Sequence, residues 1–511
     1  MIVIDRLPAV AGRLGPVFRA AGFTVDGVAE ALGAEAGAAL DRGEPEPARR
    51  CLPDDGPFPV LVRLFLLAET VTPGEAAAAF APVALDELLD AGLLGRRGDG
   101  VVAGLDLRPH ADEHGSWWVV SDLDGGEGKD VEHVLGAGAA SMSLARATVR
   151  RPVGTLLDLG AGCGVQTLHC SGHATTLTAT DVSARANTLA RATFAVSGVD
   201  AEVLTGPWWE PVEGRRFDQV VCNPPFVPGP PAVEHVYRDS GLGGDGASAL
   251  LVSTLPAFLT PGGVGQLLAS WLITGADLQA ADEPGTGWTA RPRQWVEEAT
   301  RAAAPGGLDA WVVQRDVADP ALHVGTWLRD AGVDPASPVG RARSAEWLDF
   351  FAAHDVVGIG FGFVTLRRTA AGDEGTVVLE DMRQAIGDPL GPEIEAWLDR
   401  VAWLRGHDLL DEPLVAPPTT ALERGYTGSD EGWRRIGGTL VRLDGPQWRH
   451  DLDELGESLL AGCRGHLPLA DLLELLAVAH GRDAEELTAA ALPVVRDLFL
   501  HGLLVPRDAA P

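Results

Sequence analysis

Residues 156–164 read LLDLGAGCG, and this stretch decides how the middle of the chain folds. The leucine-rich run predicts a short buried strand, and the glycines after it allow the backbone to turn sharply into a helix. Glycine also lets a ligand approach the backbone closely, so the turn is a candidate binding loop for a nucleotide-like molecule. Because such a loop alone also suits NAD or FAD, the residues around it must decide the ligand.

Two acidic residues beside the loop favour S-adenosylmethionine. Asp158 stands on the strand before the glycines, where a carboxylate suits the ammonium group of a methionine moiety and would repel a pyrophosphate. The run 176–181 (TLTATD) ends a second strand at Asp181, whose carboxylate is placed to accept hydrogen bonds from both ribose hydroxyls. A strand-end aspartate also serves often as a helix cap, and that alternative stays open for Asp181.

A third signal is FDQVVCNPPF at residues 217–226, an apolar strand that runs into an Asn-Pro-Pro-Phe turn. Alone, this turn could be a simple strand terminator, since proline ends strands readily. The turn follows the fourth of the strands that the apolar runs of the chain predict. In that position, the sequence resembles the class I S-adenosylmethionine methyltransferases that carry an N-P-P-[FY] motif. Among them are the release-factor glutamine methyltransferases and the small-domain methyltransferases of ribosomal RNA. The resemblance covers about residues 131–368.

The resemblance implies a set of cofactor-binding residues. The family often has an acidic residue near adenine after the third strand, whereas this chain has Gly-Pro-Trp-Trp at 206–209, so that Trp208 either stacks on adenine or packs in the core. The cofactor-binding residues that we expect are Asp158, Gly160, Gly162, Gly164, Asp181, Trp208 and Asn223.

The expected catalytic residues are Asn223, Pro224, Pro225 and Phe226. An amide or aromatic amine is a poor nucleophile because its lone pair is delocalised. The Asn223 side chain and the Pro224 carbonyl could both accept hydrogen bonds from one NH2 group and offset the charge that develops on it. The prolines stiffen the turn, and Phe226 could stack on a planar substrate. No metal is expected.

The loop after this turn is the expected substrate-facing segment. Its candidate residues are Tyr237 and Arg238, in a charged, glycine-rich stretch that runs to Gly246. A solvated loop before the next helix is an equally good interpretation.

Seven apolar runs, most of them separated by helix-length segments, predict an α/β fold with a doubly wound, seven-stranded Rossmann-like sheet. The last two runs are expected to pair as an antiparallel edge. The predicted strands are Thr155–Leu159, Thr176–Thr180, Ala201–Thr205, Phe217–Cys222, Gly265–Ala269, Asp309–Gln314 and Val357–Leu366.

Helical regions flank this sheet on both sides. We expect an N-terminal helical domain at 1–115, a catalytic domain at 116–370 and a C-terminal helical domain at 371–511. Residues 61–94 and 466–504 share a rhythm of Leu-rich helices that ends in Gly-Leu-Leu, which is typical of a winged-helix module. Two unrelated amphipathic bundles would look much the same.

The chain is strongly acidic, with a net charge of −32, of which residues 1–130 carry −11, 131–370 carry −7 and 371–511 carry −14. Because no basic stripe is visible, we expect a protein, peptide or small-molecule acceptor rather than a nucleic acid. The predicted function is therefore N-methylation of an amide or amine nitrogen on a protein or peptide, in the cytoplasm. The alternatives are an adenine or guanine N-methyltransferase of ribosomal RNA, a natural-product methyltransferase, or a domain that has lost catalysis.

Overall fold

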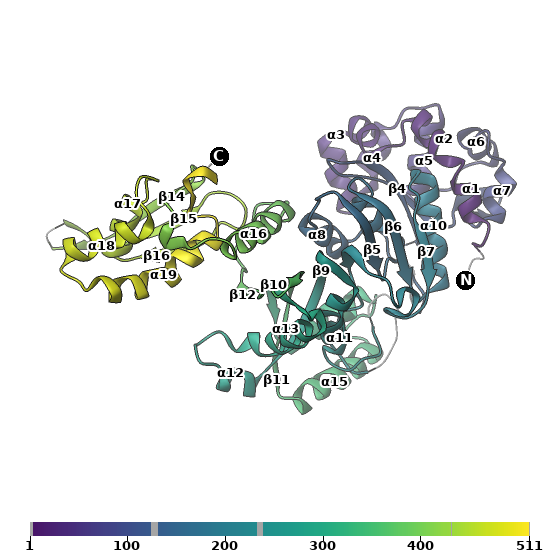
Figure 1. Cartoon of the computed structure of the whole chain (residues 1–511). Helices are drawn as coiled ribbons and strands as arrows, with labels where there is room; N and C mark the ends of the chain where they lie inside the picture. Colours follow the sequence, from purple (N-terminus) through teal and green to yellow (C-terminus); the bar gives the residue numbers. More distant parts are fainter. Residues whose placement is uncertain (1–3, 124–130, 232–238, 431, 510–511) are drawn as a thin grey trace. The chain divides into compact units, whose positions relative to one another are not determined.

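The computed structural model describes residues 4–123, 131–231, 239–430 and 432–509. The chain divides into two compact units (Figure 1). The first comprises Met1–Ala145 with Arg151–Gly372, and the second comprises Arg146–Arg150 with Asp373–Pro511.

A twisted sheet forms the centre of the first unit, with its strands in the order β10-β11-β9-β8-β5-β6-β7. Strands β9, β8, β5, β6 and β7 run parallel, whereas β11 is antiparallel to both β9 and β10. This confirms the predicted doubly wound Rossmann-like fold and its antiparallel last pair. The strands are β5 (Val153–Leu159), β6 (Ala174–Asp181), β7 (Glu202–Thr205), β8 (Phe217–Cys222), β9 (Leu259–Thr274), β10 (Gly306–Ala318) and β11 (Val356–Ala371).

The helices between the strands cover both faces of this sheet. Crossovers between parallel strands are right-handed, and the order of the strands reverses direction after β7. The helices that follow β5 and β6 therefore lie on the opposite face from α11, which follows β8. The helices of this region are α8 (Ala139–Ala147), α9 (Val165–Cys170), α10 (Ala184–Ser197), α11 (Gly246–Thr254), α12 (Gly275–Ala280), α13 (Ala290–Ala303), α14 (Pro320–Asp330) and α15 (Pro338–Ala353).

The N-terminal region is helical, as expected, and ends in two β-hairpins. The helices are α1 (Leu7–Ala11), α2 (Leu14–Ala21), α3 (Val25–Asp41), α4 (Pro45–Cys51), α5 (Pro57–Phe65), α6 (Pro73–Ala79) and α7 (Leu85–Asp90). The hairpins are β1 (Leu94–Arg97) with β2 (Gly100–Ala103), and β3 (Asp106–Ala111) with β4 (Ser116–Ser121). The expected domain boundary at 115/116 therefore lies inside the second hairpin.

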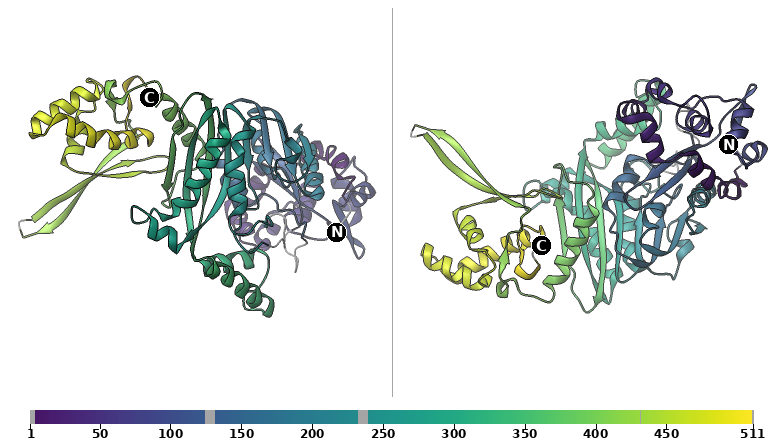
Figure 2. Two further views of the ribbon diagram at one scale, coloured as in Figure 1. Left: turned by 60° about the horizontal axis from the view of Figure 1, so that its bottom comes forward. Right: turned by 90° about the horizontal axis from the view of Figure 1, so that it is seen from above.

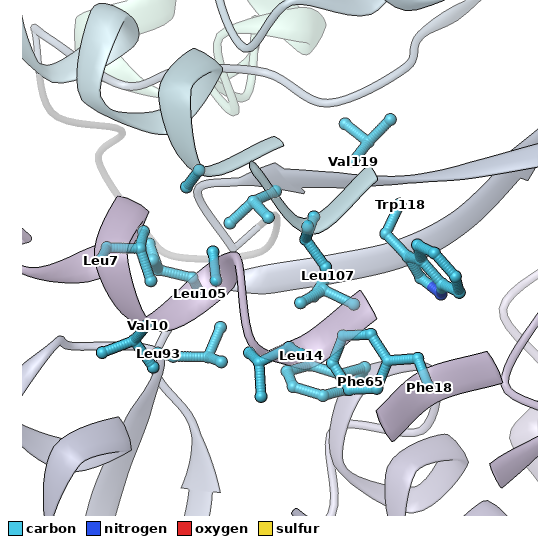
Figure 3. Packing of buried hydrophobic residues seen from close by; sticks show 14 of the residues in the cluster. Leu7, Val10, Leu14, Phe18, Phe65, Leu93, Leu105, Leu107, Trp118 and Val119 are labelled. Carbon is cyan, nitrogen blue, oxygen red and sulfur yellow. The ribbon is translucent and has the colours of Figure 1, made fainter. Parts of the chain in front are cut away.

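One hydrophobic core joins these N-terminal elements to α9 and α10 of the sheet region. It includes Phe18 and Trp118 on the N-terminal side, and Leu168 and Phe194 from the two helices. Figure 3 shows its N-terminal part, in which apolar side chains of α1, α2 and α5 lie beside those of the hairpin β3–β4. The residues labelled there are Leu7, Val10, Leu14, Phe18, Phe65, Leu93, Leu105, Leu107, Trp118 and Val119.

Hydrogen bonds fix β4 directly against α10. The backbone N–H of Trp118 donates to Ser197 Oγ at 3.0 Å, and that of Val120 donates to Thr193 Oγ1 at 3.0 Å. The Trp118 indole N–H donates to the carbonyl of Phe23 at 2.7 Å. Because these donors are buried and paired, the N-terminal helices are held firmly to the helix that follows β6.

The second unit contains strands as well as the expected helices. Its elements are β12 (Val377–Asp381), α16 (Gly391–Leu404), β13 (Leu414–Val415), β14 (Thr420–Ser429), β15 (Gly432–Arg442), β16 (Arg449–Leu452), α17 (Glu454–Gly462), α18 (Leu469–His480), α19 (Ala484–Leu500) and β17 (Val505–Pro506). The sequence did not predict the long hairpin β14–β15. Figure 2 shows this hairpin, in light green, as a ribbon whose tip stands away from the helices of its own unit.

Within the described residues, no helix combines the length and the apolar character that a bilayer crossing requires.

Candidate active site

Three strands of the sheet end at the same level, and their ends define the candidate site. Leu159 of β5 pairs with Thr180 of β6 on one side and with Cys222 of β8 on the other. The glycine loop, Asp181 and Asn223 follow these three residues directly. Since β5 and β8 flank the point where the strand order reverses, this edge is where a doubly wound sheet forms its ligand crevice.

The glycine loop leaves open space above its backbone. Gly160 and Gly162 have φ values of 73° and 56°, and a Cβ placed on either would meet nothing within 4 Å. The N–H groups of Gly160 and Ala161 both donate to the carbonyl of Thr180 at 2.9 Å, which holds the loop against β6. The two glycines thus form a cradle that side chains would fill, and this fits a ligand lying on the backbone.

Gly164 has a different role from the other two glycines. Its φ is 91°, and a Cβ there would lie 2.4 Å from a ring atom of Phe194. We expected it to line the cofactor, whereas the space that it leaves is occupied by the α10 side chain Phe194. Gly164 therefore allows α9 and α10 to pack closely.

Asp158 lies beneath the loop with no exposed surface. Its Oδ2 accepts hydrogen bonds from the backbone N–H of Thr167 at 2.9 Å and from the Thr167 hydroxyl at 2.7 Å. Its Oδ1 is buried and has no partner among the described residues. Burial raises the pKa of Asp158 to about 7, against the lowering effect of the Thr167 hydrogen bonds. An unpartnered buried carboxylate oxygen fits a cationic ligand close by.

Asp181 holds the loop from the other side. Its Oδ2 accepts from the N–H of Gly162 at 2.9 Å, and its Oδ1 accepts from the N–H of Ser183 at 2.8 Å. The N-cap of α10 is Ser183, whose hydroxyl accepts from the N–H of Ala186. Burial raises the pKa of Asp181, and the backbone donors lower it. Each carboxylate oxygen keeps a second lone pair for another donor.

Of the two tryptophans after β7, the second is the core residue. Trp209 is buried, stacks on Phe258 with ring centroids 4.2 Å apart, and donates its indole N–H to Thr254 Oγ1 at 2.8 Å. Trp208 is half-buried and has a left-handed backbone, with φ at 47°. The core packing that we considered for Trp208 is provided by its neighbour.

The side-chain amide of Asn223 makes a hydrogen bond through its nitrogen, whereas its oxygen has no partner among the described residues. Its Nδ2 donates to Ser141 Oγ at 3.2 Å. Its Oδ1 is buried and has no hydrogen-bond partner among the described residues. Ser141 belongs to α8, and its backbone carbonyl also accepts from Gln166 Nε2 at 2.7 Å, so α8 is tied to α9 beside the loop. Ser141 and Gln166 were not predicted as site residues, since neither belongs to a recognisable motif.

Phe226 lies in an aromatic cluster. Its ring centroid is 5.2 Å from that of Phe361 on β11 and 6.3 Å from that of Trp327 on α14. His323, also on α14, hydrogen-bonds through Nε2 with the carbonyl of Pro228 at 2.9 Å and so fixes the chain after the motif. We did not predict this aromatic cluster, because α14 and β11 lie far from the motif in the sequence. Tyr237 and Arg238, the other expected substrate residues, lie outside the described residues.

The described residues contain no group of three or more His, Cys, Asp or Glu side chains that could hold a metal ion. The described site comprises the Asn223 amide, the backbone cradle of the glycine loop, the buried carboxylate of Asp158 and the half-buried carboxylate of Asp181.

Family models match three stretches of the chain. The model for a methyltransferase small domain matches residues 137–239, from α8 past the Asn223 turn. Two models that describe domains of unknown function, DUF7059 and DUF7782, match residues 20–104 and 395–506.

The curated relatives match a shorter part of the chain than its full length. Ribosomal RNA small subunit methyltransferase C of Salmonella newport (strain SL254) is 35% identical over 119 residues, and so is the protein of that name from Salmonella typhi. Each alignment covers 22% of this chain and 34% of the relative, so the chain spans about a third of the length of these relatives.

Two of the solved structures to which the chain is similar are named as methyltransferases. A 16S rRNA N2 G1207 methyltransferase from T. thermophilus, in complex with AdoMet and guanosine, is 20% identical, with 39% of this chain and 59% of that chain covered and a TM-score of 0.25. A SAM-dependent methyltransferase from Thiobacillus denitrificans, in complex with S-adenosyl-L-homocysteine, is 18% identical, with 45% and 91% covered and a TM-score of 0.25.

The family model and the curated relatives support the expected enzyme class. Residues 137–239 match a methyltransferase small domain, as is expected of a class I methyltransferase that uses S-adenosylmethionine. They also correct two expectations. We expected a protein or peptide acceptor and no nucleic acid, yet the relatives are named for ribosomal RNA. Both expectations rested on the net charge of the chain, which does not describe the local charge of the surface that meets a substrate.

Proposed function

We propose that this enzyme methylates an exocyclic amino group of a purine base, guanine or adenine, in small-subunit ribosomal RNA. The observation that carries the proposal is the Asn223 amide, with its Nδ2 on Ser141 and its buried Oδ1 without a partner among the described residues. A buried acceptor without a donor is costly, and the amino group of a flipped base is a donor of the right kind. Asn223 also lies within residues 137–239, which match the methyltransferase small domain, and the curated relatives of the chain are named for ribosomal RNA.

Residues around the glycine loop would hold the cofactor, which supplies an electrophilic methyl group. Gly160 and Gly162 give its methionine end room on the backbone, and Asp158 offers a carboxylate oxygen to the ammonium group. Asp181 accepts hydrogen bonds from the ribose hydroxyls, and Trp208 stacks on adenine. Asn223, at the end of β8, faces both the cofactor and the acceptor.

The Asn-Pro-Pro-Phe turn acts on the nitrogen of the base. Asn223 Oδ1 and the Pro224 carbonyl accept hydrogen bonds from the two N–H groups of one NH2, which favours a pyramidal nitrogen with its lone pair free to react. As the nitrogen becomes positive, both acceptors stabilise it more strongly than they stabilise the ground state. Phe226, braced by Phe361, stacks on the base and holds the nitrogen in line with the reacting methyl group.

The flanking regions would present the RNA. In the N-terminal region α5, an isolated bridge between Val71 and Val101, α6, α7 and the hairpin β1–β2 follow in the order of a winged-helix module. In the C-terminal region α17, a bridge between Val415 and Arg464, α18, α19 and β17 follow in the same order. This likeness supports the three-domain division that we predicted and a winged helix on each side. Ribosomal RNA as the acceptor also agrees with a cytoplasmic location.

A labelling experiment tests the proposal. Purified enzyme is incubated with tritiated S-adenosylmethionine and, separately, with free small-subunit RNA, assembled small subunits and RNA-free ribosomal protein. Label in RNA, or in the RNA of the assembled subunit, supports the proposal. Label confined to protein would contradict it.

A further inference from the structure

We infer that the outer part of the β14–β15 hairpin is a binding surface for single-stranded RNA. This inference rests on the proposed function, because it concerns how the enzyme would engage an RNA acceptor. The outer part is defined as residues 424–430 and 432–436.

The outer part of the hairpin has no third strand. β16 pairs with β15 only over Gly438–Val441, close to the base, whereas β14 and β15 pair from Thr420 with Arg442 out to Ser429 with Gly432. Beyond Gly438 the described part of the hairpin is therefore a two-stranded ribbon, and Figure 2 shows its tip away from the helices of its unit. Such a ribbon gains little from burial, so large apolar side chains there need another explanation.

Large apolar side chains are nevertheless exposed on it. Trp433 is 79% exposed, Ile436 65% and Tyr426 52%. Tyr426 pairs with Arg435, and Trp433 pairs with Gly428, which lies two residues further along β14 from Tyr426. Cross-strand partners share a face of the ribbon, so Tyr426, Trp433 and Arg435 lie on one face. Gly428 has no side chain to cover the indole of Trp433.

The spacing of the two rings suits bases. Residues diagonal to each other across two strands lie about 7–8 Å apart, which is close to twice the stacking distance of about 3.4 Å between neighbouring bases. Two exposed aromatic rings at this spacing form a stacking platform for an unpaired strand. Because every base has an aromatic face, such a platform does not depend on sequence.

The hairpin is less acidic than the rest of its unit. Residues 420–442 hold four arginines and three acidic residues, within a segment 371–511 of net charge −14, and Arg442 is paired with Glu393 and Asp444. Arg435 and Arg424 are both paired with Glu457 near the base of the hairpin. Arg434 is exposed and makes no hydrogen bond or ion pair within the part of the chain that the structure describes. It lies on the opposite face from Trp433, next to Ile436, and could neutralise a backbone phosphate.

Fluorescence anisotropy with full-length enzyme tests the inference. The probe is a fluorescein-labelled twelve-nucleotide oligouridylate, which lacks any methylatable purine amino group, and the variants are Trp433→Ala, Tyr426→Ala and Arg434→Ala. The matched control is Val478→Ala, which removes an 83% exposed apolar side chain from α18 of the same unit. Because these side chains are exposed, the melting temperature should be the same in all variants.

We expect Trp433→Ala and Tyr426→Ala each to weaken oligouridylate binding about tenfold, as the loss of one stacking ring does. Arg434→Ala should weaken it less and reduce the slope of log affinity against log salt by about 0.7. Val478→Ala should bind like the unmodified enzyme, and all variants should retain their affinity for S-adenosylhomocysteine.

Other outcomes separate this inference from the proposed function. Unchanged oligouridylate affinity in Trp433→Ala and Tyr426→Ala overturns the hairpin surface, even if the enzyme labels RNA. Self-association that Trp433→Ala abolishes, without oligouridylate binding, also overturns it. If the hairpin variants lose affinity as expected but the unmodified enzyme labels protein alone, the RNA surface stands and the proposed function fails.

Discussion

Ser141 and Asn223, which are 82 residues apart in the sequence, share a hydrogen bond of 3.2 Å from Asn223 Nδ2 to Ser141 Oγ. In the proposed function, this contact would turn the amide so that the acceptor Oδ1 is left for the substrate. Ser141 would then be a positioning residue, because it does not need to touch the reacting atoms.

Changing Ser141 to alanine should therefore reduce kcat about tenfold, because the amide would be free to rotate and lose its alignment. The affinity for cofactor should stay within about twofold. Steady-state kinetics and calorimetry measure the two effects. Ser143→Ala, at an exposed position on the same helix, is the matched control. An equal loss of activity in both variants would mean that α8 had been disturbed in general.

Asn223→Ala should lower turnover about a hundredfold or more, the usual effect of removing one preorganised hydrogen-bonding group from the developing charge. Affinity for S-adenosylhomocysteine should change little, because most of the expected cofactor contacts lie on the loop. Single-turnover kinetics with saturating cofactor measure the chemical step. If turnover survived in this variant, the role of Asn223 in nitrogen transfer would be disproved. In a double variant with Ser141→Ala, the two losses should not multiply, since both act through one amide.

Asp181→Ala should weaken binding of S-adenosylhomocysteine by at least about tenfold, since a hydrogen bond to a charged group contributes about 1.5–3 kcal/mol. Titration calorimetry measures it. Asp200→Ala, which removes an exposed aspartate near the end of α10, controls for the change in charge. Because Asp181 also accepts the Gly162 N–H, the melting temperature of each variant should be recorded. Unchanged affinity in Asp181→Ala would exclude the ribose contact.

Asp158 should make both stability and cofactor binding depend on pH. Its pKa is about 7 in the folded chain, against an ordinary value of 3.8. The folded state therefore holds the proton more tightly, and the stability gained below about pH 4 is lost as the pH rises through about 7. Without cofactor, the free energy of unfolding should fall between pH 5 and pH 8, and it should fall less in Asp158→Asn.

The affinity for cofactor should rise with pH, opposite to the free energy of unfolding, because it also depends on the ionisation of Asp158. If the ionised carboxylate meets the ammonium of the methionine moiety, affinity for S-adenosylhomocysteine should rise about tenfold from pH 6 to pH 8. Calorimetry in two buffers with different ionisation enthalpies would show the released proton. The same slope in Asp158→Asn would assign the pH dependence to another group.

The sequence predicted the central strands well, for a physical reason. The apolar runs of β5 and β8 end at glycine and at Asn-Pro-Pro, which cannot continue a central strand, so both ends were visible. β9, β10 and β11 were predicted too short, because their outer parts mix glycine, threonine and charged residues. In the structure, the register of β5 and β8 places Gly160 level with Asn223.

The partners of the site residues could not be predicted. Ser141 reaches Asn223, and Phe361 reaches Phe226, only through the tertiary fold. The hairpin β14–β15 was not predicted because apolar and polar residues alternate only weakly along it and glycines interrupt the pattern. The acceptor was predicted wrongly because the net charge of −32 was treated as if it acted everywhere. A charge is screened within about 8 Å at physiological salt, so the arginines and aromatic rings near a binding surface decide which acceptor binds there.

Identification of the methylated nucleoside tests the central claim most directly. Small-subunit RNA that has reacted with the enzyme and deuterated S-adenosylmethionine is digested to nucleosides and analysed by mass spectrometry against standards. The account predicts a methyl group on the exocyclic nitrogen of guanosine or adenosine, absent when Asn223→Ala replaces the enzyme. A methyl group on a ring carbon, on a ribose oxygen or on ribosomal protein would contradict it.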